Sequence, residues 1–148
     1  MDSANARTVV GYMAACNTGD LPALENAFAE DVVAYFIDQA PVRGRAALAQ
    51  FWARVHRVTG ARWTCDRVIA QDDDVVVEWT EMWTPKGATA PVLSRGVDLF
   101  EMRDGRIAEI RQYHRPTALP WHQPFEMQHY PYTARGYPVA GDFDEKVR

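Results

Sequence analysis

Apolar residues recur at helical spacing in three segments near the start of the chain. The first covers about 5–17, the second follows Asp20, which is suited to cap a helix, and the third follows Arg45. In each segment the apolar positions lie three or four residues apart and therefore share one stripe. These stripes consist of Val9, Tyr12, Met13 and Cys16; of Leu21, Leu24 and Phe28; and of Leu48, Phe51, Trp52, Val55 and Val58. The pattern predicts three helices, with a short strand over 32–37 before the third.

After Gly60 the period of the apolar positions changes to two, which is typical of strands. Polar turns separate the strands, and Asp104–Gly105 is a strong hairpin signal because its turn requires positive φ angles. The predicted strands cover residues 62–70, 75–84, 92–102 and 107–114. Helices followed by four antiparallel strands predict an α+β domain, with the helices on one face of a curved sheet.

The end of the chain differs in composition from the rest. Residues 115–148 contain five of the nine prolines, together with Trp121, Phe125 and four further aromatic side chains. Proline breaks helices and removes strand donors, whereas so many aromatics are uncommon in a disordered tail. We therefore predict a domain over residues 1–115 and an extended arm over 116–148. The arm packs on the domain or on a neighbouring subunit.

Composition excludes several classes of protein. The chain has 148 residues, of which 47% are hydrophobic and 24% charged, so it can bury a core without metal or disulfide support. No apolar run approaches the ~20 residues of a membrane helix, and the net charge of −4 argues against nucleic-acid binding. The N-terminus lacks a signal peptide, which favours a cytoplasmic protein with Cys16 and Cys65 as reduced thiols. His122 and His129 lack metal-ligand spacing, so we expect no metal site.

Three segments resemble the SnoaL-like and ketosteroid-isomerase-like superfamily. They are Asn-Thr-Gly-Asp-Leu at 17–21, Phe-Ala-Glu-Asp-Val at 28–32, and Gly-Val-Asp-Leu-Phe-Glu-Met-Arg-Asp-Gly-Arg-Ile at 96–107. The resemblance spans roughly 5–115 and implies the fold of nuclear transport factor 2. That fold is a cone-shaped, curved antiparallel sheet wrapped by three N-terminal helices, with a pocket inside. Because the superfamily includes isomerases, cyclases, dehydratases, epoxide hydrolases and non-catalytic binders, the resemblance specifies the fold more than the reaction.

The similarity to ketosteroid isomerase implies a site in which the oxyanion-binding residues have counterparts and the general base has none. The tyrosine of that enzyme's first helix corresponds to Tyr12, and the protonated aspartic acid of its late strand corresponds to Asp98. A second tyrosine, on the third helix, corresponds to Trp52, and the general-base aspartate corresponds to Phe36. Asp38 shares the strand parity of Phe36, and its participation is left open.

Strand parity and the resemblance together predict the rest of the pocket. Alternate strand residues share a face, and the resemblance assigns Asp98 and His114 to the inner one. An aspartate and a histidine on adjacent strands are within reach for acid–base chemistry, as in SnoaL-like cyclases. The other predicted pocket residues are Glu78, Thr80, Met82, Phe100, Ile110 and Gln112. Trp79, Glu81 and Trp83 are expected on the outer face, although a slip of one residue would exchange the two sets.

The leading hypothesis is a cofactor-free acid–base enzyme, either a cyclase, an isomerase or a dehydratase. Its substrate is expected to be a hydrophobic, cyclic or polyketide-like small molecule. Asp98 and His114 would move a proton, and Tyr12 would hydrogen-bond a developing oxyanion. The alternative is a non-catalytic ligand-binding or assembly protein of the same fold. An epoxide hydrolase is less favoured, since Gly96 stands where that family's arginine precedes Asp98.

The predicted outer sheet face suggests a homodimer. An exposed apolar patch would be formed there by Trp79, Trp83 and Val77, to which Val97 and Leu99 could add. Monomers rarely expose apolar patches beyond a few hundred Å². We therefore expect two copies packed sheet to sheet about a two-fold axis. The arm that starts after His114 either covers the mouth of the cone or packs outside it.

Overall fold

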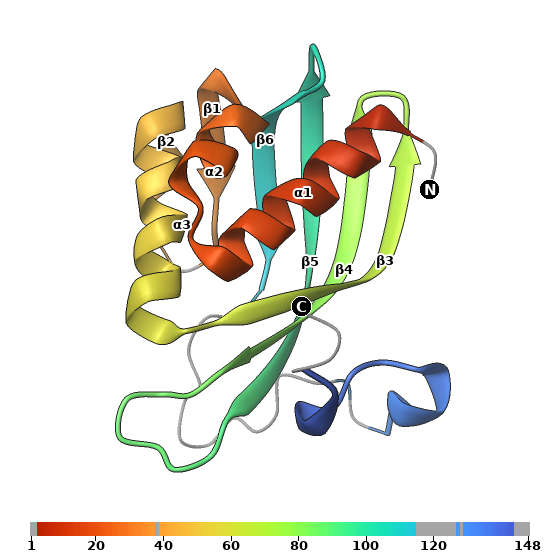
Figure 1. The fold of residues 1–148 in the computed structure, drawn as a ribbon. Coiled ribbons are helices and arrows are strands. Elements are labelled where there is room, and N and C mark those ends of the chain that lie inside the picture. Colours follow the sequence, from red (N-terminus) through yellow and green to blue (C-terminus); the bar gives the residue numbers. More distant parts are fainter. Residues whose placement is uncertain (1–2, 38, 115–126, 128, 144–148) are drawn as a thin grey trace.

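A computed structural model describes residues 3–37, 39–114, 127 and 129–143, and it confirms the predicted α+β fold (Figure 1). The elements are α1 (Ala4–Thr18), α2 (Leu21–Ala27), β1 (Phe28–Tyr35), β2 (Val42–Arg43), α3 (Arg45–Thr59), β3 (Arg62–Gln71), β4 (Asp74–Trp83), β5 (Val92–Arg103), β6 (Arg106–Tyr113) and the short 3-10 helices η1 (Thr133–Arg135) and η2 (Ala140–Asp142). The six strands form one open sheet in the order β2-β1-β6-β5-β4-β3. It is mixed, because β1 runs parallel to β6 whereas the other pairs are antiparallel.

The helix boundaries follow from local capping. Ser3 caps α1, and Gly19 ends it with a φ of 66° in the left-handed region, where glycine is favoured. Asp20 caps α2 by accepting a hydrogen bond from the Ala23 amide at 3.1 Å. Val58 differs from the prediction: it lies in the last turn of α3 and is 70% exposed.

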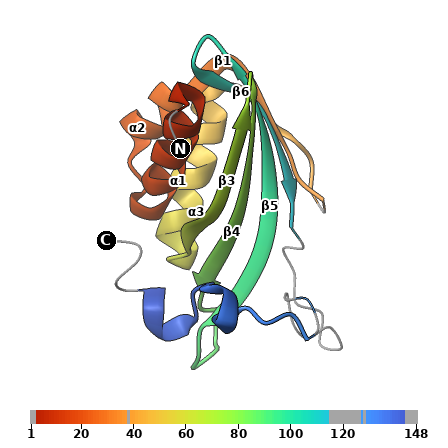
Figure 2. The same ribbon diagram turned by 90° about the vertical axis from the view of Figure 1, so that its right-hand side faces the viewer.

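All three helices cover one face of the curved sheet, which Figure 2 shows nearly edge-on. Between these layers, Tyr12 of α1 packs against Phe28, Trp52 and Phe100, with ring centroids 5.4–6.3 Å apart. Phe28 also marks the true start of β1, four residues before the predicted strand, because it pairs there with Ile107 of β6. The spacing of apolar residues along the sequence cannot predict a pairing with a strand so far away in the chain.

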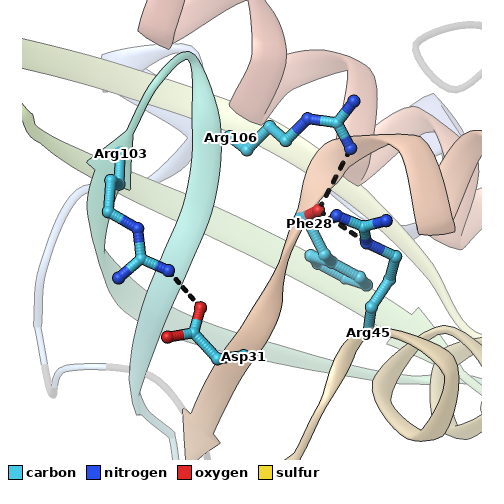
Figure 3. Close-up of polar contacts among 5 residues, drawn as sticks. All are labelled: Phe28, Asp31, Arg45, Arg103 and Arg106. Carbon is cyan, nitrogen blue, oxygen red and sulfur yellow. Dashed lines mark hydrogen bonds and ion pairs between the residues drawn. The ribbon is translucent and has the colours of Figure 1, made fainter.

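Arginine side chains secure the junction between α2, β1 and the β5–β6 hairpin (Figure 3). The Phe28 carbonyl accepts hydrogen bonds from Arg45 at 3.0 Å and from Arg106 at 3.4 Å, and Arg103 pairs with Asp31. The β1–β6 register shifts just after Phe28. The side-chain donors thus support the backbone where the regular ladder is interrupted.

Residues 129–143 pack on the sheet through contacts with β4 and β5, and Tyr130, Arg135 and Tyr137 also face a hollow lined by α1 and β3. The Arg95 guanidinium of β5 donates to the Pro138 carbonyl at 3.0 Å and lies 4.4 Å from the Tyr132 ring. The Tyr137 hydroxyl donates to Glu78 of β4 at 2.6 Å. In its described part the predicted arm therefore packs on the domain. Trp121 and Phe125 of the arm lie outside the described residues, as does the boundary after residue 115, so coverage of the mouth of the cone stays a prediction.

Among the described residues, none of the helices is long and apolar enough to cross a membrane.

Candidate functional site

A cavity of about 190 Å³ lies between α3, the β1–β2 connection and the inner face of the sheet. Its walls are mainly aromatic, with a few polar groups on the sheet side. The lining residues are Phe36, Ile37, Gln39, Phe51, Trp52, Val55, Thr59, Trp63, Trp79, Glu81, Trp83, Gln112 and His114. Four predicted site residues are among them: Phe36, Trp52, Gln112 and His114. A mostly apolar pocket with a few convergent polar groups is typical of small-molecule sites.

The predicted orientation of β4 is wrong. Val77 pairs with Asp98, and Trp79 pairs with Gly96, so the inward face of β4 carries Trp79 and Glu81. Trp83 belongs to the same face and also lines the cavity. The three consecutive valines at 75–77 place apolar side chains on both faces, and alternation in that stretch therefore could not decide the orientation.

The opposite parity places Glu78, Thr80 and Met82 on the outer face, away from the cavity. Glu78 accepts the hydrogen bond from Tyr137, and Thr80 donates to Asp66 of β3 at 2.5 Å. These three residues are consequently not pocket residues, contrary to the prediction. The same inversion removes Trp79 from the predicted dimer patch, since its side chain is fully buried.

Three other predicted site residues lie in the core instead of lining the cavity. Phe100 and Ile110 are fully buried, and Tyr12 is 2% exposed. Burial raises the pKa of Tyr12, and the nearby Cys16 and Asp98 raise it further. In this structure Trp52 packs edge-on against Tyr12 and itself lines the cavity. The tyrosine that the resemblance assigns to the oxyanion therefore stands behind Trp52.

Asp98 is a buried carboxyl group just behind the cavity wall. Its partner on β6 is Gln112, whose amide nitrogen lies 3.5 Å from a carboxylate oxygen. Burial raises the pKa of Asp98 to about 7, although the Gln112 amide opposes the shift. Gln112 lines the cavity, whereas Asp98 does not. Asp98 is thus placed to position one wall residue, Gln112.

The acidic side chain beside His114 is Glu81, not Asp98 as predicted. The Nε2 atom of His114 lies 3.7 Å from an oxygen of Glu81, and both side chains are 12% exposed. The Ser94 hydroxyl donates to the same oxygen at 2.8 Å, and the His114 ring packs against Trp79 at 4.9 Å between centroids. Burial lowers the pKa of His114 to about 4 and raises that of Glu81 to about 7. Near neutral pH a neutral imidazole therefore faces a carboxyl group that readily gains or loses a proton.

One sequence signal could have identified Glu81. Trp79, Glu81 and Trp83 alternate along β4 and must share a face, and tryptophan is more often buried than glutamate or threonine. Gly96, opposite Trp79, leaves the space that an inward indole needs. Asp98 lies on the inner face, as predicted, together with Phe100, which packs against Tyr12. The predicted face of β4 depends on the resemblance alone.

The thiols and the described histidines form no second reactive centre. Cys16 and Cys65 are free thiols, and burial raises the pKa of both, that of Cys65 to about 11. Such thiols are poor nucleophiles near neutral pH. Within residues 3–37, 39–114, 127 and 129–143, no three His, Cys, Asp or Glu side chains gather as metal ligands would. Asp38 and His122 lie outside these residues.

The family model of the SnoaL-like domain matches residues 9–110, and the chain belongs to this family. A comparison with curated proteins finds no match.

Solved structures share the fold over most of their length. A protein of unknown function with a cystatin-like fold from Methylobium petroleophilum PM1 is 25% identical, with a TM-score of 0.68 over 92% of this chain and 91% of that one. A protein provisionally assigned as a polyketide cyclase, from Xanthomonas campestris pv. campestris, is 26% identical, with a TM-score of 0.66 over 76% and 90%. An LEH-like epoxide hydrolase from M. tuberculosis is 23% identical, with a TM-score of 0.66 over 74% and 81%, which shows the fold alone.

Proposed function

We propose that the protein is a cofactor-free acid–base enzyme of the cyclase, isomerase or dehydratase type. The observation that carries this proposal is the pair of Glu81 and His114, 3.7 Å apart in a cavity with aromatic walls. Their shifted pKa values, about 7 for the acid and about 4 for the base, leave both groups largely uncharged just below neutral pH. All three reaction types need a group that takes a proton and a group that gives one.

In this proposal His114 takes a proton from a carbon of the substrate. The protonated form of Glu81 gives a proton to the oxygen or carbon that becomes electron-rich. Burial keeps His114 neutral, so the imidazole is available as a base. Burial also keeps part of the Glu81 population protonated, so this carboxyl group is available as an acid. Asp98 is a positioning residue that acts through Gln112.

The size of the cavity restricts the substrate. A volume of about 190 Å³ is below the roughly 300–1,000 Å³ of typical drug-sized ligand sites. It suits one or two fused rings, or one end of a longer polyketide-like molecule. The aromatic walls favour a flat, apolar ring system, and the polar groups on β4 and β6 favour an oxygen substituent at that side.

The proposal is tested by proton exchange on a small cyclic ketone. 2-Indanone in deuterated buffer exchanges the hydrogens beside its carbonyl group, and NMR follows their loss. We expect the wild-type protein to accelerate this exchange and the variants Glu81→Gln and His114→Asn each to lower the acceleration by about 100-fold, a typical contribution of one acid or base.

Glu78→Gln is the matched control, because Glu78 lies on the same strand but on the outer face. It is expected to exchange 2-indanone as fast as the wild type. Equal rates in wild type, Glu81→Gln and His114→Asn would contradict the proposal. Saturable binding of 2-indanone with no acceleration would favour the alternative, a binding protein of the same fold that does not turn its ligand over.

A further inference from the structure

Ser94 of β5 lies directly opposite Glu81 of β4. Alternate residues of a strand share a face, so Ser94 points inward together with Gly96 and Asp98. Its side chain is fully buried. Glu81 lines the cavity, whereas Ser94 is not among the lining residues. The Ser94 hydroxyl group therefore reaches Glu81 from behind the cavity wall.

Ser94 and His114 approach the same carboxyl oxygen of Glu81. The Ser94 hydroxyl donates to Oε2 at 2.8 Å, and Nε2 of His114 lies 3.7 Å from that atom. Within the part of the chain that the structure describes, no other side chain hydrogen-bonds this carboxyl group. Burial raises the pKa of Glu81 to about 7, and the bond from Ser94 opposes that shift. A hydrogen bond of this kind stabilises a carboxylate and also fixes its orientation.

The proposed reaction creates a negative charge on Glu81. When His114 takes a proton from the carbon beside a ketone, the electron pair of that C–H bond forms a carbon–carbon double bond. The carbonyl oxygen receives the displaced electron pair and takes the proton of Glu81. A carboxylate then remains beside an imidazolium ion. A buried carboxylate is costly unless hydrogen bonds support it, and the Ser94 hydroxyl already points at the oxygen that becomes charged.

We infer that Ser94 is a positioning residue, which holds the Glu81 carboxyl group beside His114 and stabilises the carboxylate left after Glu81 gives its proton. This inference rests on the proposed function, because it assigns Ser94 a part in the same reaction. Ser94 acts through Glu81 and does not line the cavity. It thereby sets the acidity of Glu81 and the highest pH at which the acid form persists.

The ionisation of Glu81 tests the inference without relying on turnover. ¹³C NMR of the full-length protein, labelled at the glutamate side-chain carboxyl carbon, follows the titration, and Glu81→Gln assigns the signal. The wild type is expected to show a midpoint near 7. In Ser94→Ala we expect this midpoint to rise by about one pH unit, because the carboxylate loses a hydrogen bond that the neutral acid needs less.

Two other titratable groups face Glu81 within the described residues. His114 on β6 has a pKa of about 4 and is neutral near pH 7. Asp98 on β5 interacts electrostatically with Glu81 and has a pKa of about 7. The cavity-lining residues of α3, β3 and the β1–β2 connection carry no titratable side chain. Ser94→Ala is therefore also measured together with Asp98→Asn, where we expect the same rise of the Glu81 midpoint.

Proton exchange of 2-indanone provides the second measurement. In Ser94→Ala we expect the rate at saturating substrate near pH 6 to fall about three- to tenfold, since a weaker acid gives its proton more slowly. The dissociation constant of 2-indanone is expected to stay within about twofold, because Ser94 does not line the cavity. Ser94→Thr keeps the hydroxyl group and is expected to restore both the exchange rate and the Glu81 midpoint near 7.

Thr64→Val is the matched control. Thr64 is also buried, and its hydroxyl donates to a carboxylate, that of Asp66, at 2.7 Å, but neither residue lines the cavity. This variant is expected to leave the Glu81 midpoint and the exchange rate unchanged. An unmoved Glu81 midpoint in Ser94→Ala would overturn the inference, as would an equal rise in Ser94→Thr or in Thr64→Val.

The two proposals fail in different ways. If the wild type does not accelerate the exchange of 2-indanone, the proposed function is rejected, and the part of Ser94 in that reaction with it. If Glu81→Gln and His114→Asn lose the exchange as expected while the Glu81 midpoint in Ser94→Ala does not move, only the role of Ser94 is rejected. The acid–base proposal then stands.

Discussion

Gly96 and Trp79 lie opposite each other on β5 and β4, and a Cβ atom at Gly96 would stand 2.3 Å from the Trp79 ring. No side chain other than that of glycine leaves the indole in this place. Trp79 in turn packs against His114, with 4.9 Å between the ring centroids. The absence of a side chain at Gly96 therefore helps to position the base of the proposed site.

We predict that Gly96→Ala destabilises the protein by about 1–3 kcal/mol, the usual cost of overpacking a core. Urea unfolding measures the change. Gly11→Ala is the control, since nothing lies within 4 Å of a Cβ atom there and α1 continues through that position. It is expected to stabilise the protein by up to about 1 kcal/mol, because alanine favours a helix over glycine. Equal effects of the two substitutions would show that Trp79 can move freely.

The buried carboxyl group of Asp98 predicts a pH-dependent stability difference. Its pKa is about 7 in the folded protein against an ordinary value of 3.8, so the folded state binds the proton more tightly. The contribution of Asp98 to stability therefore falls as pH rises from about 4 to 7 and is constant above. At about 1.4 kcal/mol per pH unit, the wild type loses up to about 3 kcal/mol relative to Asp98→Asn between pH 5 and pH 8.

Chemical unfolding of both proteins at pH 5 and pH 8 measures this difference. Glu81 titrates in the same range in both proteins, so its effect cancels in the comparison to a first approximation. A stability difference that is the same at the two pH values would mean that the Asp98 carboxyl group is not desolvated.

The extent of sequence-based prediction depended on whether a feature is local. Local features were predictable, because each depends on a few neighbouring residues: the helix stripes, the helix end at Gly19 and the Asp104–Gly105 turn. Asp104 and Gly105 have positive φ angles of 53° and 73°, as that turn requires. The start of β1 at Phe28 was not predictable from local sequence, since it depends on pairing with β6. The predicted site residues were wrong on β4. Which face of β4 points inward is set by the cross-strand packing of Trp79 on Gly96, and the opposite choice assigned Glu81 to the outer face.

Arg95 is expected to hold the C-terminal segment 129–143 on the sheet. It donates to Pro138 and stacks on Tyr132, and both contacts require the guanidinium group. In Arg95→Ala we expect amide hydrogen exchange within 130–137 to accelerate more than about tenfold, as loss of a charged hydrogen bond implies. Arg54→Ala, at an exposed position on α3, is the control. Unchanged exchange in Arg95→Ala would mean that the tyrosines alone hold the segment.

The homodimer remains a prediction, and the apolar outer surface available for it is smaller than the patch predicted from the sequence. Trp79 and Val77 point inward, and residues 129–143 cover part of the outer face. Val97 and Leu99 are half-buried there, and Tyr113 is 58% exposed. Sheet-to-sheet pairing would have to use this uncovered region. Light scattering at micromolar concentration is expected to give twice the chain mass of 16.8 kDa; a strict monomer would contradict the prediction.

His114 supplies the most direct test of the site's electrostatics. Burial lowers its pKa from 6.5 to about 4, so the folded state resists protonation, and stability falls as pH drops from 6.5 toward 4. NMR of the imidazole is expected to show a titration midpoint near 4. The midpoint should stay there in Glu81→Gln, because the Glu81 carboxyl group, with its pKa near 7, is already protonated in that range. It should rise toward 6.5 in Phe36→Ala, which opens the cavity wall to water. A wild-type midpoint near 6.5 would show that His114 is hydrated, and the case for a neutral buried base beside Glu81 would fail.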